Sequence, residues 1–521
     1  MKKKISTIIL IFPFVCGLAY AQSPALDYTF FKDTALSLQY NNSALLHTME
    51  TPLLGESKLG YFYEEGEFKH LYQGESKHGV QFSSERFEKL KDWVFYGAFD
   101  FKSFKEIAVD ITSHAQPFRS NPYQVADSLK GDWHKQNYNL KLKVAAPKLV
   151  QDKLTLGMGL SYNVLTGARQ KDPRPLNTSN ELELAPSVLY ELNKNHSIGL
   201  TGAYQFYRED LSVERINMNQ NYNMYKLLGL GEYEASSPII VSSNSIVRSY
   251  KGNKYGGELF YSYQHHNLNW KIGGSYHHYE EEVIDGTTFP KNAGLHSYHE
   301  YGIISSLAWK SQHTSQYILL KWNQRDFDNR EFHQLQNSQT KQYETIYTSI
   351  FNTALKSDAT LEYFFSKSRP NNLPTWWLKL GAGYDGFDNR YTIPQSFEIV
   401  DKINVSLSFD KQYELKKGDV LSFRIGSNYN FIIEDKISYT EKDFSTNFVA
   451  NNIFYPIHGY NALESWNNDL NIQYNLKPFQ KSGNQLFIRA NGFINTAMQD
   501  NNWFNKGDTR QGFQLTIGLY N

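Results

Sequence analysis

Cysteine is almost absent from this sequence, and its absence excludes several kinds of site. The single cysteine, Cys16, lies in an N-terminal segment that we expect to be removed, so the mature chain has none. A disulfide scaffold, a thiolate nucleophile and a cysteine-ligated metal are therefore excluded. Net positive charge is absent too, because 53 basic residues balance 53 acidic ones. The sequence thus offers no electrostatic basis for binding nucleic acid.

Long apolar runs are missing after residue 22, so transmembrane helices are not expected. The mean hydropathy is only −0.55. Aromatic residues are nevertheless abundant, at 15% of the chain, with 37 Tyr, 34 Phe and 9 Trp. In a transmembrane β-barrel every second residue faces lipid and the others face a polar lumen, which keeps mean hydropathy low. The composition therefore favours a membrane β-barrel.

The first residues have the features of a secretory signal. Lys2 to Lys4 form a basic start, and an apolar run extends from Ile5 to Leu18. The run closes with Ala19-Tyr20-Ala21, a small-x-small pattern that predicts cleavage between Ala21 and Gln22. We therefore expect an exported protein whose signal peptide is residues 1–21.

Apolar and polar residues alternate strictly along much of the chain. In KINVSLSFD, the residues Ile403, Val405, Leu407 and Phe409 alternate with polar neighbours such as Lys402. Such alternation is typical of a strand with different solvents on its two faces. The same pattern occurs at 138–144, 268–276, 421–431, 470–476 and, at the end of the chain, 513–519. We expect the odd-numbered apolar residues of 403–409 and 513–519 to contact lipid.

Short polar turns alternate with longer segments between these strands. The longer segments are 115–132, 167–180, 208–253, 281–296, 327–345, 435–465 and 498–509. This arrangement predicts an all-β fold, an antiparallel transmembrane β-barrel of about 16–18 strands in the cell outer membrane, with short periplasmic turns and long extracellular loops. We expect three regions: a signal peptide at 1–21, a periplasmic or lumen-associated segment at 22–92, and the barrel at 93–521.

The charged residues on the other face of the strands are candidates for lining the lumen. We expect this inward set to tune permeation or to form structural ion pairs, and the sequence favours neither. Its members are Lys141, Lys143, Lys271, Lys321, Arg325, Lys379, Lys402, Asp410, Arg424 and Arg489.

Tryptophans near strand ends predict interfacial girdles. They are Trp133, Trp270, Trp309, Trp322, Trp376, Trp377 and Trp466.

Histidines and glutamates gather around the segment 281–296. A hairpin symmetric about it would place Glu281 opposite His296, and Glu300 opposite His277. The two histidines would then lie about four residues apart along the wall, roughly 13 Å, which is too far for one ion. We therefore expect polar lumen and rim residues here. The sequence predicts no catalytic, cofactor-binding or metal site, and no enzyme.

Two prolines stiffen the segment GARQKDPRP. Pro173 and Pro175 fix φ, and Asp172 before Pro173 favours an extended turn. We expect an ordered loop in which Arg169 and Arg174 form ion pairs or contact an acidic partner.

Two stretches resemble a known family. They are YQGESKHGVQFSSERFEKLKDWVFYGAFDF, residues 72–101, and YNVLTGARQKDPRPLN, residues 162–177. Both are similar to segments of an uncharacterised outer-membrane β-barrel family of Bacteroidota. The resemblance implies an accessory role in nutrient or metal uptake, with a TonB-dependent receptor and a surface lipoprotein as partners besides outer-membrane lipid.

Three functions therefore remain open from the sequence. The first is a transport-associated barrel, either a channel or an accessory subunit of an uptake system. The second is a surface-binding or adhesion barrel that acts through its loops, and the third, least favoured, is an outer-membrane enzyme.

The segment 208–253 carries many apolar residues, including Leu227, Leu230 and Ile239. We expect it to fold into the barrel mouth as a constriction or to bind a partner, because exposed apolar patches are usually buried or used.

Overall fold

A computed structural model gives the fold of the chain. It describes residues 24–49, 55–217, 223–234, 245–368, 374–415, 418–440, 447–479 and 483–521. The predicted cleavage site between Ala21 and Gln22 lies outside the described residues.

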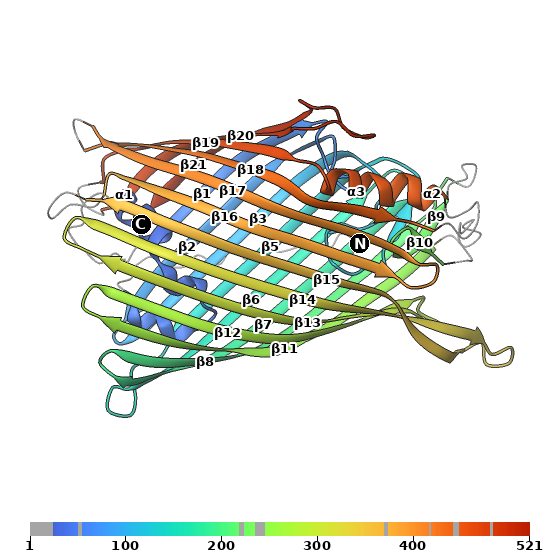
Figure 1. The fold of residues 1–521 in the computed structure, drawn as a ribbon, viewed down its shortest axis with the longest axis horizontal. Coiled ribbons are helices and arrows are strands. Elements are labelled where there is room, and N and C mark those ends of the chain that lie inside the picture. Colours follow the sequence, from blue (N-terminus) through green and yellow to red (C-terminus); the bar gives the residue numbers. More distant parts are fainter. Residues whose placement is uncertain are drawn as a thin grey trace, which may run out of the picture.

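An antiparallel sheet of 18 strands forms the wall (Figure 1). The strands are β1 (Gly55–Gly66), β2 (Ser76–Leu90), β3 (Trp93–Val109), β5 (Gly131–Ala145), β6 (Leu154–Arg169), β7 (Arg174–Asn193), β8 (His196–Glu214), β11 (Ser245–His265), β12 (Leu268–Asp285), β13 (Lys291–Lys310), β14 (Thr314–Gln336), β15 (Tyr343–Lys367), β16 (Trp376–Tyr391), β17 (Ser396–Glu414), β18 (Val420–Ser438), β19 (Ser465–Asn475), β20 (Gln485–Ala497) and β21 (Thr509–Tyr520).

The sheet closes because the first and last strands pair with each other. Antiparallel pairing runs from Glu56 opposite Tyr520 to Gly66 opposite Arg510. The closed barrel agrees with the fold class expected from the sequence. The expected boundary at residue 93 is wrong, since β1 and β2 are both wall strands. Their charged residues obscure the alternation, but closure satisfies backbone groups that an open edge would leave unpaired.

The two ends of the barrel differ in their connections. One end, here called the turn end, holds connections such as residues 194–195 and 266–267 and lies near both termini of the wall. The opposite loop end holds the connections 110–130, 215–244 and 439–464. Several expected loops are shorter than predicted, because the strands continue into them. Only residues 170–173 separate β6 from β7, for example.

The strands have an apolar outer face and a polar inner face. On β17, Val405 is 50% exposed and Leu407 47%, and Ile403 and Phe409 are also exposed. On β21, Phe513, Leu515 and Ile517 are exposed in the same way. The predicted outward facing of the odd residues is therefore confirmed at these positions.

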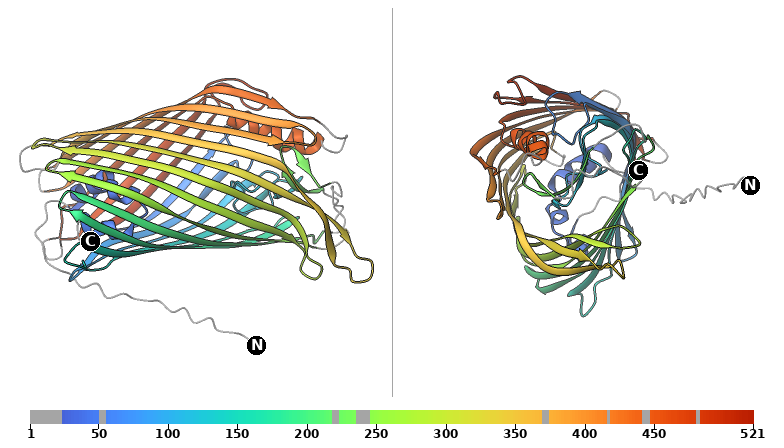
Figure 2. Two further views of the ribbon diagram at one scale, coloured as in Figure 1. Left: turned by 60° about the horizontal axis from the view of Figure 1, so that its bottom comes forward. Right: turned by 90° about the vertical axis from the view of Figure 1, so that its right-hand side faces the viewer.

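The interior of the turn end is occupied by the N-terminal segment. Residues 24–48 form α1 (Pro24–Thr34), η1 (Leu36–Gln39) and η2 (Ser43–Thr48), and they lie inside the barrel (Figure 2). We call residues 24–48 the plug. One wall glycine permits its close approach, because a Cβ on Gly157 would lie 2.4 Å from the backbone nitrogen of Ala44. Part of the expected segment 22–92 is therefore lumenal.

The loop end is covered by three inward-folded segments, which we call the lid. The first is loop 110–130 with β4 (Val125–Asp127), and the second is 223–234 with β9 (Met224–Gly229) and β10 (Glu232–Tyr233). Strands β4, β9 and β10 form a small sheet of their own. The third segment contains α2 (Asn447–Val449), η3 (Ala450–Phe454) and α3 (Tyr455–Asn461).

The tryptophans do not all follow the interfacial pattern expected. Trp270 and Trp466 are exposed on the outer face. Trp133 and Trp377 are instead completely buried. Trp133 packs with Ala115 of the lid and with wall residues, and Trp377 packs with wall residues and with Phe30 and Leu36 of the plug. Among the described residues, no helix has the length and apolar character needed to cross a membrane.

Candidate functional site: a plugged and lidded lumen

Asp33 of the plug is held by three side chains of the wall. Its carboxylate accepts hydrogen bonds from Trp377 Nε1 at 2.9 Å, Lys379 Nζ at 2.9 Å and Arg424 Nη2 at 2.7 Å. Arg424 also donates to Asp410 at 2.7 Å. Three of the residues predicted to line the lumen therefore meet at the plug.

Apolar contacts and further hydrogen bonds spread the plug around the whole wall. Phe31 packs edge-on against Phe87 of β2, with 5.3 Å between ring centroids. On another side, Asn42 donates to the backbone oxygens of Val188 and Leu200, each at 3.2 Å. The plug therefore contacts strands far apart around the barrel, as expected for a closure and not for a tail lying along one side.

Three more predicted lumen residues lie toward this turn end. Lys321 Nζ donates to Gln39 of the plug at 2.7 Å. Arg489 pairs with Glu56 of β1 at 2.8 Å and so crosses the seam where the barrel closes. Lys271 is buried, and its Nζ donates to Asn269 at 2.9 Å.

The remaining predicted residues lie on the lumen face of other strands. On β5, Leu140 and Leu142 are exposed outside, so Lys141 and Lys143 between and beyond them point inward. Arg325 of β14 pairs with Glu300 at 2.8 Å. The last, Lys402 of β17, lines a cavity described below.

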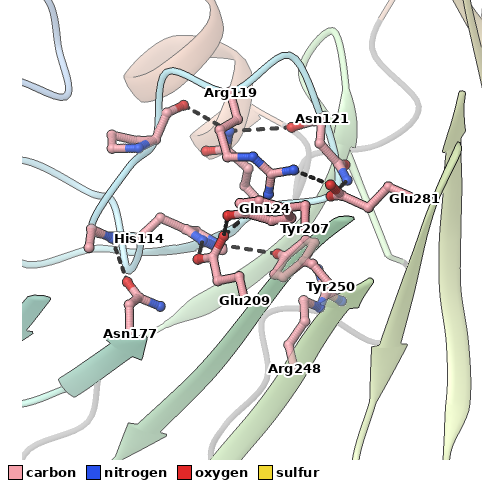
Figure 3. A network of polar contacts seen from close by, with 12 residues as sticks. His114, Arg119, Asn121, Gln124, Asn177, Tyr207, Glu209, Arg248, Tyr250 and Glu281 are labelled. Carbon is pink, nitrogen blue, oxygen red and sulfur yellow. Dashed lines mark hydrogen bonds and ion pairs between the residues drawn. The ribbon is translucent and has the colours of Figure 1, made fainter. Parts of the chain in front are cut away.

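Arg119 fixes the first lid segment to the wall (Figure 3). Its guanidinium pairs with Glu209 of β8 at 3.2 Å and with Glu281 of β12, and it stacks over Tyr207 with 3.8 Å to the ring centroid. Burial alone would lower the pKa of Arg119, but Glu281, Tyr207, Tyr279 and Glu209 together raise it well above its usual value. The arginine thus stays charged between two buried carboxylates.

His114 supports the same lid segment. Its Nε2 accepts a hydrogen bond from the backbone N–H of Val125 at 2.9 Å, and its Nδ1 lies 3.0 Å from Glu209. Since one ring nitrogen accepts, the other carries the proton and donates to the carboxylate. Asn121 adds a 2.6 Å hydrogen bond to Glu281 (Figure 3).

The predicted ordered loop contributes to this end of the barrel. Arg169 is buried and donates to Asp127 of the lid at 2.8 Å and to the backbone oxygen of Pro173 at 2.9 Å. Asp172 accepts from Arg174 at 2.8 Å and from the backbone N–H of Ile216 at 2.9 Å. Within the described residues these groups are all held by neighbours in the protein.

The apolar residues of 208–253 divide between wall and lid. Leu227 packs with Tyr72 of the connection 67–75 and with lid residues such as Tyr225 and Val449. Leu230 packs against Phe454 and a wall tyrosine. Residues 223–234 therefore fold into the barrel mouth. Ile239, Ile240 and Val241 lie outside the described residues.

Two histidines at the loop end, His70 of the connection 67–75 and His458 of the lid, have pKa values displaced in opposite directions. Burial lowers the pKa of His70 to about 4, with Lys69 and Lys402 adding to the effect. Burial would also lower the pKa of His458, but its hydrogen bond with Glu398 and the charges of Glu398 and Asp435 outweigh it and raise the pKa. His458 lies 3.0 Å from Glu398 and 2.8 Å from Asp435.

A cavity of about 720 Å³ lies beneath the lid. Its lining includes His70 of the connection 67–75, lid residues such as Phe118 and Arg119, and wall residues from β7 to β17. Wall residues include Glu181, Gln205, Tyr207, Tyr298, Arg325, Lys356, Asp385 and Lys402. The lining is thus a mixture of charges, amides and aromatic rings, suited to a small polar solute.

The histidine–glutamate hairpin has the register expected from the sequence. His277 pairs opposite Glu300, and Glu281 opposite His296. His296 contacts Asn329 at 2.6 Å and Ser120 of the lid at 3.2 Å. No group of three or more potential metal ligands occurs within the described part of the chain.

Sequence reasoning missed Asp33 and Arg119, although they carry the closure at the two ends. Neither residue belongs to an alternating strand, so the period-two pattern that located the wall residues could not find them. The apolar content of 223–234 was the one signal that predicted an inward-folded loop.

Comparison with known proteins places this geometry in context. Residues 43–521 match the sequence model of a family of unknown function, DUF6850. No curated protein matches the chain.

Solved structures with a similar fold are outer-membrane proteins. The copper transporter OprC is 7% identical, with a TM-score of 0.39 and 91% of this chain and 82% of that chain covered. BauA, the ferric preacinetobactin receptor from Acinetobacter baumannii, is 8% identical, with a TM-score of 0.39 and 89% and 80% covered. A FadL homologue from Pseudomonas aeruginosa is 10% identical, with a TM-score of 0.32 and 93% of each chain covered. Similarity this low assigns no cargo.

Proposed function

We propose, for a chain that belongs to this family of unknown function, a transport-associated role in the outer membrane as a gated pore. Its turn end faces the periplasm and its loop end the outside, as in other outer-membrane barrels. The observation that carries the proposal is the plug, residues 24–48, held inside the wall by Asp33. The plug is bound by ion pairs, hydrogen bonds and aromatic packing, but it contributes no strand to the sheet, so it can leave without breaking the backbone pairing of the wall.

The proposed resting state is closed at both ends. The plug occupies the periplasmic end, and the lid covers the outer end through Arg119 and its two carboxylates. Ions pass the lid, so removal of the plug alone is enough for ionic conductance, whereas passage of a larger solute requires both to move. The proposed function is non-enzymatic, and binding of a TonB-dependent receptor and a surface lipoprotein, the partners implied by the family resemblance, remains part of the proposal.

Conductance in planar bilayers tests the proposal. We expect the mature wild-type protein to conduct poorly, and a variant lacking residues 24–48 to conduct in large, stable steps. Heat-modifiable mobility in gels controls for barrel assembly, because a folded barrel migrates differently from the boiled chain. An assembled variant that conducts no better than wild type would refute the gate and favour the surface-binding alternative.

A further inference from the structure

We propose that the cavity beneath the lid binds a short neutral oligosaccharide along the inner face of strands β14 to β17. This inference rests on the proposed transport function and specifies its solute. The cavity has a volume of about 720 Å³, and pockets of that size hold solutes of several hundred daltons. Disaccharides and trisaccharides fall within this range.

Four adjacent strands contribute residues to the cavity lining in the same order. On each strand the three lining residues are spaced two apart, so they share the inner face. From the plug side toward the lid, each strand gives a charged residue, an apolar residue and a second polar residue. They are Arg325, Phe327 and Asn329 on β14, Lys356, Ala354 and Asn352 on β15, Asp385, Phe387 and Asn389 on β16, and Lys402, Val400 and Glu398 on β17.

The cross-strand register joins the apolar residues into one strip between two polar rows. Phe327 is directly opposite Ala354, and Phe387 is directly opposite Val400. Phe387 lies diagonal to Ala354, and diagonal neighbours on one face are about 7–8 Å apart, within reach of an aromatic ring. Ala354 and Phe387 are half-buried and face the cavity, whereas Phe327 and Val400 are buried beside them.

A pyranose ring has a shape complementary to this strip. Its two faces carry C–H groups that pack on apolar and aromatic surface, and its hydroxyl groups point outward around the edge. A ring lying on the strip would direct hydroxyl groups toward the polar rows on both sides. Within the described residues, Lys356, Asp385 and Lys402 make no side-chain hydrogen bond, so they retain the donors and acceptors that hydroxyl groups require.

The charges of this wall offset one another, which favours a neutral solute. Asp385 is directly opposite Lys402 on β17. Asp358, directly opposite Asp385 on the other side, lies two residues from Lys356 on the same face of β15. Arg325, the remaining cation of the row, pairs with a neighbouring glutamate at 2.8 Å. A charged solute would lose hydration here without meeting a surplus of opposite charge.

The lid supplies a second apolar surface on the same side of the lumen. Phe118 is 59% exposed and lines the cavity. Its ring centroid is 5.0 Å from that of His70. Burial lowers the pKa of His70, and the nearby charge of Lys402 adds to this effect, so Phe118 lies toward β17. Gln116 of the lid also lines the cavity, and its amide offers both a donor and an acceptor.

Equilibrium dialysis of the full mature protein in detergent tests the inference. The probes are radiolabelled maltotriose, cellotriose, mannotriose and xylotriose, which are neutral trisaccharides that differ in configuration and linkage. Trigalacturonic acid is the acidic comparison, and N-acetyl-tri-alanine amide is a neutral peptide of similar size. Dialysis over many hours allows for slow entry past the lid. We expect saturable binding of at least one neutral trisaccharide, about tenfold or more tighter than either comparison compound.

Matched variants connect binding to the strip. Phe387→Ala and, on the lid, Phe118→Ala should each weaken trisaccharide binding about tenfold, because each removes a ring contact. Asp385→Asn should weaken it by a similar factor through loss of a charged acceptor. Phe289→Ala, an exposed phenylalanine outside the lining, and Asp388→Asn, on the outer face of β16, are the controls and should bind as wild type does. Heat-modifiable mobility shows that each variant is assembled.

Several results would overturn the inference. These are no saturable binding of any of the trisaccharides, or equally tight binding of the acidic trisaccharide or the capped peptide. Wild-type affinity in the assembled Phe118→Ala and Asp385→Asn variants would also overturn it. Dialysis does not require the plug to leave, whereas the gate is tested by conductance after removal of residues 24–48, so the two failures are distinguishable.

Discussion

Replacing Asp33 by asparagine should loosen the plug while leaving the barrel wall unchanged. The aspartate carboxylate accepts from Trp377, Lys379 and Arg424 at 2.7–2.9 Å. Asparagine keeps the size and one acceptor oxygen, but it loses the charge and directs an NH₂ group toward cationic neighbours. The substitution therefore removes mainly the two charge-assisted contacts.

The magnitude follows from those contacts. A hydrogen bond to a charged group contributes about 1.5–3 kcal/mol, and removing one partner of a buried pair costs about 3–5 kcal/mol. Arg424 retains Asp410, and the asparagine oxygen still accepts from Trp377, so we expect a net loss of about 2–3 kcal/mol. Since 1.4 kcal/mol is a factor of ten, the released fraction of the plug should rise about 30- to 150-fold.

Single-channel recording measures this fraction as open probability. Lys32→Gln is the matched control, because Lys32 is also a plug residue that pairs with the wall, through Glu85, but its side chain is 38% exposed. Exposed pairs contribute about 0–1 kcal/mol, so that variant should raise open probability by less than about fivefold. The assignment of Asp33 as the anchor would be refuted if Asp33→Asn had the same open probability as wild type while the variant lacking residues 24–48 conducted.

Four further predictions concern the lid and the wall. Arg119→Met should leave two buried carboxylates without their cation and cost about 3–5 kcal/mol of lid docking. Amide hydrogen exchange in loop 110–130 should therefore be faster, whereas unchanged exchange would contradict this role of Arg119. Because the pKa of His458 is raised in the folded protein, its contribution to the stability of α3 is complete below about pH 6.5 and is lost as pH rises through the folded-state pKa. Amide protection of α3 should therefore fall at alkaline pH in wild type and stay constant with pH in His458→Gln. Val405→Asp should lower the yield of heat-modifiable barrel, because a charge at mid-bilayer costs about 2–4 kcal/mol. Asn404→Asp, at an inward-facing position, should assemble normally. Equal yields of the two variants would contradict the assignment of Val405 to the lipid face. Deleting Asn223 to Val247 should leave conductance low while the plug remains. Combined with removal of residues 24–48, the same deletion should give a higher conductance than removal of residues 24–48 alone. A large rise from the loop deletion alone would show that the plug does not close the pore.

Local pattern determined the fold class and much of the register. Strict alternation placed Val405 and Leu407 outside and Lys402 inside, because successive side chains of a strand point to opposite faces whatever the rest of the chain does. Hairpin symmetry placed Glu281 opposite His296 for the same reason, since antiparallel partners are set by distance from the turn. Prolines in 167–175 indicated an ordered loop without showing what holds it.

Closure of the pore was decided only by tertiary structure. Asp33 has no recognisable pattern around it, and its three partners come from β16 and β18, more than 340 residues away along the chain. Arg119 likewise meets Glu209 and Glu281 only because the closed barrel brings β8 and β12 beneath loop 110–130. Periodicity reports which solvent a residue faces, whereas a contact across the lumen depends on how the whole wall closes, so the sequence identified the inward charges and the fold alone assigned their partners.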